Sequence, residues 1–304
     1  MHHKRLVLTL FALLALLAAP LRARAELKVV ATVPTLAAVA KEIGGSKVTV
    51  KSLALPTQDP HFVDAKPSLA LELNKADLLV VVGLQLEVGW LPPLQLGARN
   101  ADIQVGGKGY LDCSQFVRLL EKPEVVDRSQ GDIHPGGNPH YLYDPRSVVR
   151  VAKAIADRMG ELDPPNKAFY QAKLKHFVSS VETETAALKA RLAPYAGSPV
   201  IGYHKSWAYL ADWLGLKQIE FIEPKPGIPP NPAHVAKVLA TARTQNVRMI
   251  IQESFYPDST TKLIADKSGA RLVVVPGGVD FAGGESYLDH LDEIVKLVEK
   301  GLAR

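Results

Sequence analysis

The stretch PPNKAFYQAKLKHFVSSVETETAALKARL, residues 164–192, predicts one long helix in the middle of this chain. After its two prolines it contains helix-compatible residues, with no further proline and no glycine. Its apolar residues recur at roughly helical spacing, at Phe169, Leu174, Phe177, Val181 and Leu188. Proline fits the first turn of a helix, and Pro194 followed by Gly197 ends it. Such a helix would be about 40 Å long at ~1.5 Å per residue, so we predict a rigid helix that joins two lobes.

Short β-branched runs alternate with helical patterns on both sides of this helix, which is typical of α/β proteins with parallel sheets. The predicted strands are Lys28–Thr32, Val48–Leu53, Leu78–Val82, Pro199–Tyr203, Gln218–Ile222, Met249–Gln252 and Arg271–Val275. The predicted helices are Pro34–Ile43, Ser68–Lys75, Arg146–Leu162 and Pro232–Gln245. We therefore predict an α/β fold with an N-terminal lobe at residues 26–163, a connecting helix at 164–197 and a C-terminal lobe at 198–304.

Residues 1–25 differ from the rest of the chain. They contain four basic residues and no acidic ones, an apolar run over Leu6–Ala19, and the ending Ala23-Arg24-Ala25. This pattern is typical of a secretory signal peptide, and about 14 apolar residues are fewer than the ~20 that span a bilayer. We expect cleavage of this segment and a mature chain in an exported compartment, most simply a bacterial periplasm.

The positive charge of the 304-residue chain, +5, belongs mostly to that segment. Removing its four basic residues from the total of 36 leaves 32 against 31 acidic residues. A nearly neutral mature protein argues against a nucleic-acid partner. The single cysteine, Cys113, excludes an intramolecular disulfide and a cysteine-based zinc site. Since no cysteine stands near the expected cleavage site, we expect neither a lipid anchor nor membrane insertion of the mature chain.

Three histidines lie at predicted strand ends or just before helices. His61 ends LPTQDPH (55–61), His140 lies in NPHYLYDP (138–145), and His204 ends VIGYH (200–204). Ligands of open α/β sheets collect at such positions. Two of the three directly follow a proline, whose fixed φ gives the rigidity that suits a metal ligand. Two ordinary proline turns without a ligand role are the alternative, and spacing alone leaves it open.

The other histidines are weaker candidates. His134 lies in the loop 127–139 and could bind metal weakly, whereas His176 lies on the long helix. We interpret His290, next to Asp289 and near Asp292 and Glu293, as part of a solvent-exposed helix face. The common zinc-protease, nucleophile-elbow, P-loop and dinucleotide-binding motifs are absent from the sequence.

The segments around His61, His140 and His204, together with several others along the chain, resemble the zinc- and manganese-binding solute-binding proteins of bacterial ABC transporters, the cluster A-I family. The resemblance covers the whole mature chain. The matching segments, in order, are VVATVP (29–34), DPH (59–61), KPS (66–68), ADLL (76–79), LE (86–87), NPHYLYDP (138–145), YH (203–204), YL (209–210), IQE (251–253) and SYL (286–288).

The resemblance implies a metal ion between the two lobes, held by His61, His140, His204 and an aspartate late in the chain. Three histidines imply Zn²⁺ rather than Mn²⁺, because imidazole suits zinc while manganese prefers oxygen donors. The fourth position departs from the family pattern of an aspartate directly after the last strand, since this chain reads VPGGVD over 275–280. We expect Asp280 to be the fourth ligand. Glu253 is the alternative, as a ligand or as a hydrogen-bond acceptor behind one, and water is a third possibility.

The function that the resemblance implies is a monomeric periplasmic protein that binds zinc with high affinity and delivers it to an inner-membrane ABC permease, without catalysis. A manganese-binding protein of the same family is the main alternative. A zinc hydrolase with Glu253 as general base, and a surface adhesin or structural module, are further alternatives. Loop 127–139 stands where zinc-type relatives carry a long insert rich in histidine and acidic residues. Here it is short, with only His134, Asp127 and Asp132, so we expect no strong metal-scavenging role for it.

Overall fold

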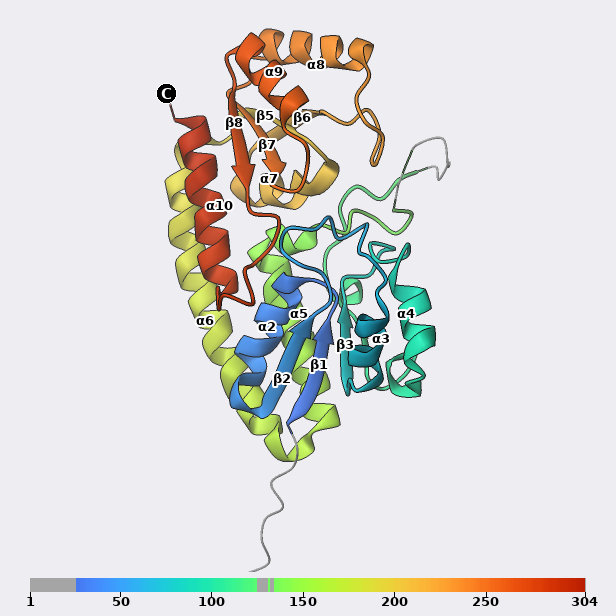
Figure 1. Ribbon diagram of the computed structural model, residues 1–304. Helices are drawn as coiled ribbons and strands as arrows, with labels where there is room; N and C mark the ends of the chain where they lie inside the picture. Colours follow the sequence, from blue (N-terminus) through green and yellow to red (C-terminus); the bar gives the residue numbers. More distant parts are fainter. Residues whose placement is uncertain (1–25, 125–130, 132–133, 304) are drawn as a thin grey trace, which may run out of the picture.

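The computed structural model describes residues 26–124, 131 and 134–303, so the predicted signal peptide lies outside the described residues. It contains two four-stranded parallel sheets, one in each lobe (Figure 1). The first has the order β2-β1-β3-β4 and consists of β1 (Leu27–Ala31), β2 (Val48–Ser52), β3 (Leu78–Val81) and β4 (Tyr110–Asp112). The second has the equivalent order β6-β5-β7-β8 and consists of β5 (Pro199–Gly202), β6 (Lys217–Phe221), β7 (Met249–Glu253) and β8 (Arg271–Val275). The predicted α/β class is confirmed.

Helices cover both faces of the first sheet. The helices α2 (Pro34–Gly44) and α5 (Pro145–Leu162) pack on one face, and α3 (Pro67–Asn74) and α4 (Leu91–Ala98) belong to the core of the other. Side chains alternate between faces along a strand, so Val29 of β1 points into the first core and Val30 into the second. The continuous apolar runs of the sequence follow from this burial on both faces.

The second sheet is built in the same way. Ile201 and Ile250 pack against α8 (Pro232–Thr244) and α9 (Ser259–Ser268) on one face. The opposite face joins the large core that also contains α7 (Ala208–Leu214) and α10 (Tyr287–Leu302). Since this core also includes α2 and α5, it runs without interruption from one lobe to the other.

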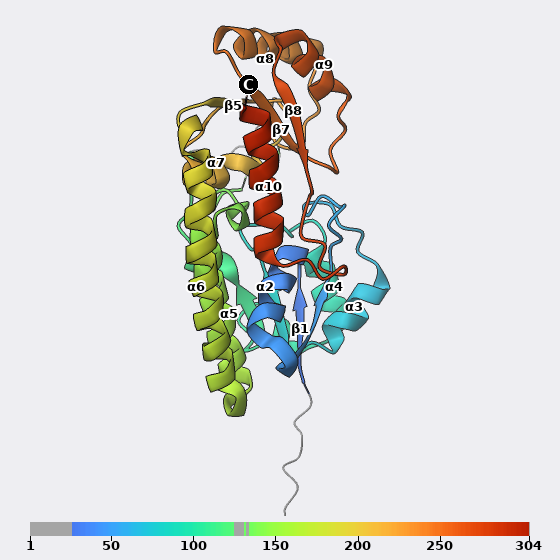
Figure 2. The ribbon, with the colours of Figure 1, turned by 90° about the vertical axis from the view of Figure 1, so that its left-hand side faces the viewer.

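The long helix predicted from the sequence is α6 (Lys167–Leu192), with short 3₁₀ turns at Pro164–Asn166 and Ala193–Tyr195. It extends along both lobes beside α10 (Figure 2). Arg191 of α6 hydrogen-bonds Asp292 and Glu299 of α10. The two helices therefore connect the lobes. The exact domain boundaries, drawn after residues 163 and 197, stay predictions.

The structure adds elements that the sequence pattern does not predict, among them β4, α4, α7 and α9. β4 has three residues and α7 has seven, which is too short for a clear period, and α4 opens with Leu91-Pro92-Pro93. No helix within the described ranges combines the length and apolar content that crossing a bilayer requires.

Candidate metal centre

The three candidate histidines project from loops at the facing ends of the two lobes. His61 follows β2, His140 precedes α5, and His204 follows β5. The two X-Pro-His segments have the same local structure. In each, the side chain before the proline accepts a hydrogen bond from the backbone N–H of the histidine. Asp59 Oδ1 accepts from His61 N at 2.9 Å, and Asn138 Oδ1 accepts from His140 N at 2.9 Å. These Asx turns fix the direction of each imidazole.

The structure brings His61, His140 and His204 together. Each pair of rings has centroids 5.2 Å apart, and one ligand nitrogen from each residue lies within 4.8 Å of the other two. Nε2 of His61 and Nε2 of His140 are buried and have no hydrogen-bond partner among the described residues. Buried polar atoms in proteins almost always have partners, so this cluster has the character of an ion site. Zinc–nitrogen bonds are about 2.0–2.1 Å long, so three nitrogens within 4.8 Å of one another can surround one ion after the rings move inward.

Two of the three rings are held by carboxylates. His61 Nδ1 lies 2.7 Å from Asp59 Oδ1, and His204 Nδ1 lies 2.7 Å from Glu223 Oε2. In metal sites such a partner fixes the tautomer in which Nε2 carries the free lone pair, and it raises the basicity of the ligand. Burial alone would raise the pKa of Asp59, but its hydrogen bonds with His61 hold that pKa below the ordinary value.

His140 has a pKa well below its ordinary value, first because it is buried and then because His204 and His61 are close. A ring with such a pKa is neutral at pH 7 and keeps a lone pair for a metal ion. No proton has to leave His140 before an ion binds.

His134 lies beside this group of three histidines. Its ring centroid is 5.4 Å from that of His61, its Nδ1 is 2.9 Å from Leu84 O, and its Nε2 is buried without a partner. Burial and the nearby His61 lower the pKa of His134 to about 4. It borders a small pocket with His61, Phe62 and Val88. Asp127 and Asp132 of the same predicted loop lie outside the described residues.

The structure does not bring Asp280 into the group of three histidines. Asp280 is exposed, and its Oδ1 accepts a hydrogen bond from Gly283 N at 3.0 Å. Its segment does begin close to the centre, since Gly277 borders the same cavity as His140. The assignment of Asp280 as the fourth ligand therefore stays a prediction that requires this segment to move.

Glu253 is also outside the group, at the buried end of β7. One of its carboxylate oxygens, Oε2, has no hydrogen-bond partner. Burial raises the pKa of Glu253 to about 8, the Ser206 hydroxyl lowers it, and the nearby Asp59 and Glu223 carboxylates add to the rise. Burial thus favours the protonated form of Glu253 in the metal-free protein.

Sequence reasoning missed the role of Glu223. The signal was the parallel pairing of β5 with β6, in which Gly202 lies opposite Phe221. His204 and Glu223 each follow that pair by two residues, so they emerge side by side at the carboxyl ends of neighbouring strands.

Comparison with known proteins places these features in context. The family model described as "Zinc-uptake complex component A periplasmic" matches residues 29–301. A solved structure, "Crystal structure of ZnuA", is 25% identical, with a TM-score of 0.77 and coverage of 91% of this chain and 100% of that chain.

Two curated relatives carry the names of different metals. The manganese ABC transporter substrate-binding lipoprotein PsaA of Streptococcus mitis is 23% identical over 288 residues, 92% of this chain and 90% of the relative. The high-affinity zinc uptake system protein ZnuA of Bacillus subtilis is 23% identical over 254 residues, 82% of this chain and 78% of the relative. Overall identity therefore does not distinguish zinc from manganese.

Proposed function

This chain belongs to the family of periplasmic component A proteins of zinc-uptake complexes, and on that premise we propose that it binds Zn²⁺ and delivers it to the permease of its transporter. Members of the family are extracytoplasmic substrate-binding proteins of metal ABC transporters and not enzymes. The zinc hydrolase alternative is therefore set aside. The observation that carries the proposal is the triangle of His61, His140 and His204.

The donor set supports zinc over manganese. All three donors are imidazole nitrogens, and two of them are backed by carboxylates. Imidazole suits zinc, whereas manganese prefers carboxylate, carbonyl and water oxygens. In this structure the carboxylates of Asp59 and Glu223 each bond the Nδ1 atom of a histidine, so the group of possible ligands consists of imidazoles.

We propose Asp280 as the fourth ligand, which would close a tetrahedral shell of three histidines and one aspartate. Its segment connects β8 to α10 and contains Gly277, Gly278, Gly283 and Gly284, the last with φ +86°. Glycine permits large backbone changes, so this segment can carry Asp280 toward the ion and away again. Glu253 is the less suitable ligand, because it is fixed at the buried end of a strand and lies outside the group of three histidines.

A mobile fourth ligand suits a protein that must release its ion. Loss of Asp280 would leave three histidines and an open position that a group of the permease could take. We propose that the mature chain acts as a monomer in the periplasm, after removal of the segment 1–25.

Titration of the purified metal-free protein with Zn²⁺ against a chromophoric chelator tests this function. We expect one ion per chain with a sub-micromolar Kd, and losses of orders of magnitude in His61→Ala, His140→Ala and His204→Ala. The control is His176→Ala, which removes an exposed histidine of α6 and is expected to leave binding unchanged. Tight binding that survives in all three variants would place the site elsewhere.

A further inference from the structure

The three histidines of the centre are not held in the same way. His61 and His204 each have a carboxylate on Nδ1. The hydrogen bonds of His140 within the described part of the chain involve its backbone, and no side chain there bonds either of its ring nitrogens. The ring of His140 thus has no side-chain hydrogen bond of the kind that usually fixes the tautomer of a metal-binding histidine.

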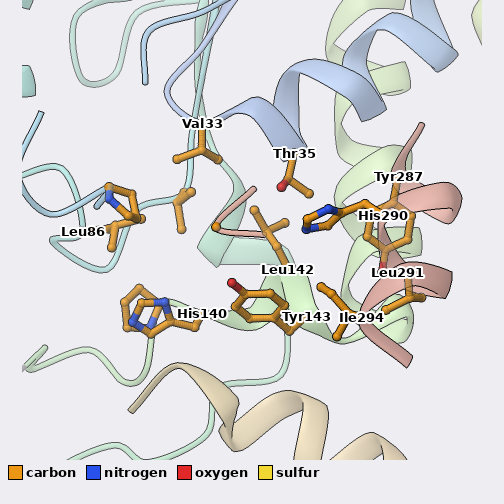
Figure 3. Close-up of a pocket in the computed structure, with 14 residues that line it drawn as sticks. Val33, Thr35, Leu86, His140, Leu142, Tyr143, Tyr287, His290, Leu291 and Ile294 are labelled. Atoms are coloured by element: carbon orange, nitrogen blue, oxygen red, sulfur yellow. The ribbon is translucent and has the colours of Figure 1, made fainter. Parts of the chain in front are cut away.

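His140 borders a cavity of about 70 Å³ that separates it from α10. Figure 3 shows the ring of His290 pointing from α10 toward this space, with Tyr143 between the two histidines and its hydroxyl directed toward His140. Thr35 adds a further hydroxyl to the walls, and the other walls are mostly apolar. Polar groups from three different segments therefore converge on a space that His140 shares.

Packing alone does not explain a histidine at position 290. Tyr287, Leu291 and Ile294 form the buried face of α10 around it, and His290 itself is 4% exposed. Its Nδ1 is buried and has no hydrogen bond within the described ranges, and Glu285 Oε1 lies 3.5 Å away, too far for a good one. An apolar side chain would satisfy this face without leaving a polar atom unpaired.

The cavity has the size that ordered water needs, and a part of its mainly apolar wall is polar. A water molecule requires about 10–15 Å³ of such volume and two to four polar partners, so the space holds several. The rings of His140 and His290 and the hydroxyls of Tyr143 and Thr35 supply those partners.

We propose that His290 is a positioning residue of the metal centre. Its ring anchors water in this cavity, and the water hydrogen-bonds the nitrogen of His140 that faces away from the ion. Water thereby fixes the tautomer of His140, as Asp59 does for His61 and Glu223 does for His204. The proposal rests on the proposed function, because it requires His140 to be a ligand. The helix α10 packs against both lobes. In this proposal the orientation of the His140 ring therefore depends on the relative position of the two lobes.

The first test needs no metal. Long-range ¹H–¹⁵N NMR of the metal-free protein reports the tautomer of each neutral histidine ring. We expect His140 in the wild type to populate one tautomer, with the lone pair on Nε2, and His290→Leu to give a mixture. Leu291→Met, which changes an apolar wall of the same cavity, is the control and is expected to keep the wild-type pattern. An unchanged His140 spectrum in His290→Leu overturns the proposal, even if zinc binding is confirmed.

The second test is a mutant cycle on the Zn²⁺ affinity, measured by chelator competition. We expect His290→Leu to weaken binding about 10-fold, which is within the range seen when a hydrogen-bond partner of a metal ligand is removed. We expect His290→Gln to retain most of the affinity. The same substitution is expected to weaken binding further in a His61→Ala background but not in a His140→Ala background. An equal loss in both backgrounds would mean that His290 acts through general packing, and this result would contradict the proposal. A wild type that binds no zinc would refute the proposed function instead, and the NMR comparison would still decide the role of His290.

Discussion

Nδ1 of His204 lies 2.7 Å from Oε2 of Glu223, two residues beyond the point where β5 and β6 pair. Both side chains are buried, so the carboxylate has little competition from solvent. The contact fixes the ring of His204 with Nε2 toward the other two histidines. The second sheet therefore contributes a ligand together with the group that orients it, through the register of a single strand pair.

Glu223→Gln is expected to lower the affinity for Zn²⁺ by about 10–100-fold, because the amide loses the charge that orients and polarises His204. Chelator competition at pH 7.5 measures the change. Glu220→Gln serves as the matched control, since it removes a nearby carboxylate, on β6, that pairs with Lys237 and with none of the three histidines of the centre. Equal affinities for Glu223→Gln and the wild type would show that His204 needs no carboxylate partner.

The fourth ligand is tested by the rate of zinc release. Asp280→Ala is expected to keep a three-histidine site with water in the open position, and to release zinc to a chelator faster than the wild type. Glu253→Gln is expected to change release little, because Glu253 lies outside the group of three histidines and the amide nearly matches its size. Stopped-flow mixing with excess chelator compares the variants. Faster release from Glu253→Gln than from Asp280→Ala would reverse the assignment.

The stability of the metal-free protein is expected to depend on pH through His290. Burial lowers the pKa of His290 to about 4, against 6.5 for an unperturbed histidine. Between these values the unfolded chain binds a proton on His290 and the folded chain does not. The contribution of His290 to the free energy of unfolding is therefore complete above pH 6.5 and is lost as the pH falls toward 4. The expected slope for this group is about 1.4 kcal/mol per pH unit.

Urea unfolding at pH 7, 5.5 and 4.5 measures this dependence in the wild type and in His290→Phe. The variant lacks the titrating ring, so its free energy of unfolding should fall less steeply with acid, whatever its absolute value. Identical slopes in the two proteins would mean that the folded state accepts a proton on His290 as readily as the unfolded chain does.

Much of the framework could be predicted from local sequence patterns. The β-branched runs and the proline-to-glycine limits of residues 164–197 identified seven strands and the long helix, because buried parallel strands and long helices carry strong local signals. The segments Asp59-Pro60-His61 and Asn138-Pro139-His140 identified two of the three clustered histidines for a local reason as well, since each Asx turn forms within three residues.

The remaining features depend on packing between distant segments. The interpretation of His290 as an exposed residue was wrong. Its acidic neighbours suggested solvent, but His290 shares its helix face with Tyr287, Leu291 and Ile294, and that face is buried. Glu223 acquires its role only from the strand register. The cavity between His140 and α10 is lined by residues from both ends of the chain. A local sequence pattern cannot predict contacts between such distant segments.

Selection of zinc by the three imidazoles is tested by direct competition between Zn²⁺ and Mn²⁺. Metal-free protein is loaded with one equivalent of Zn²⁺, dialysed against about a 100-fold excess of Mn²⁺ at pH 7.5, and its bound metal is measured by atomic emission. We predict that zinc stays bound at one ion per chain in the wild type, and that His204→Glu, which exchanges one nitrogen donor for oxygen, loses a larger share of its zinc to Mn²⁺ under the same conditions. Replacement of the bound zinc by manganese would contradict the account.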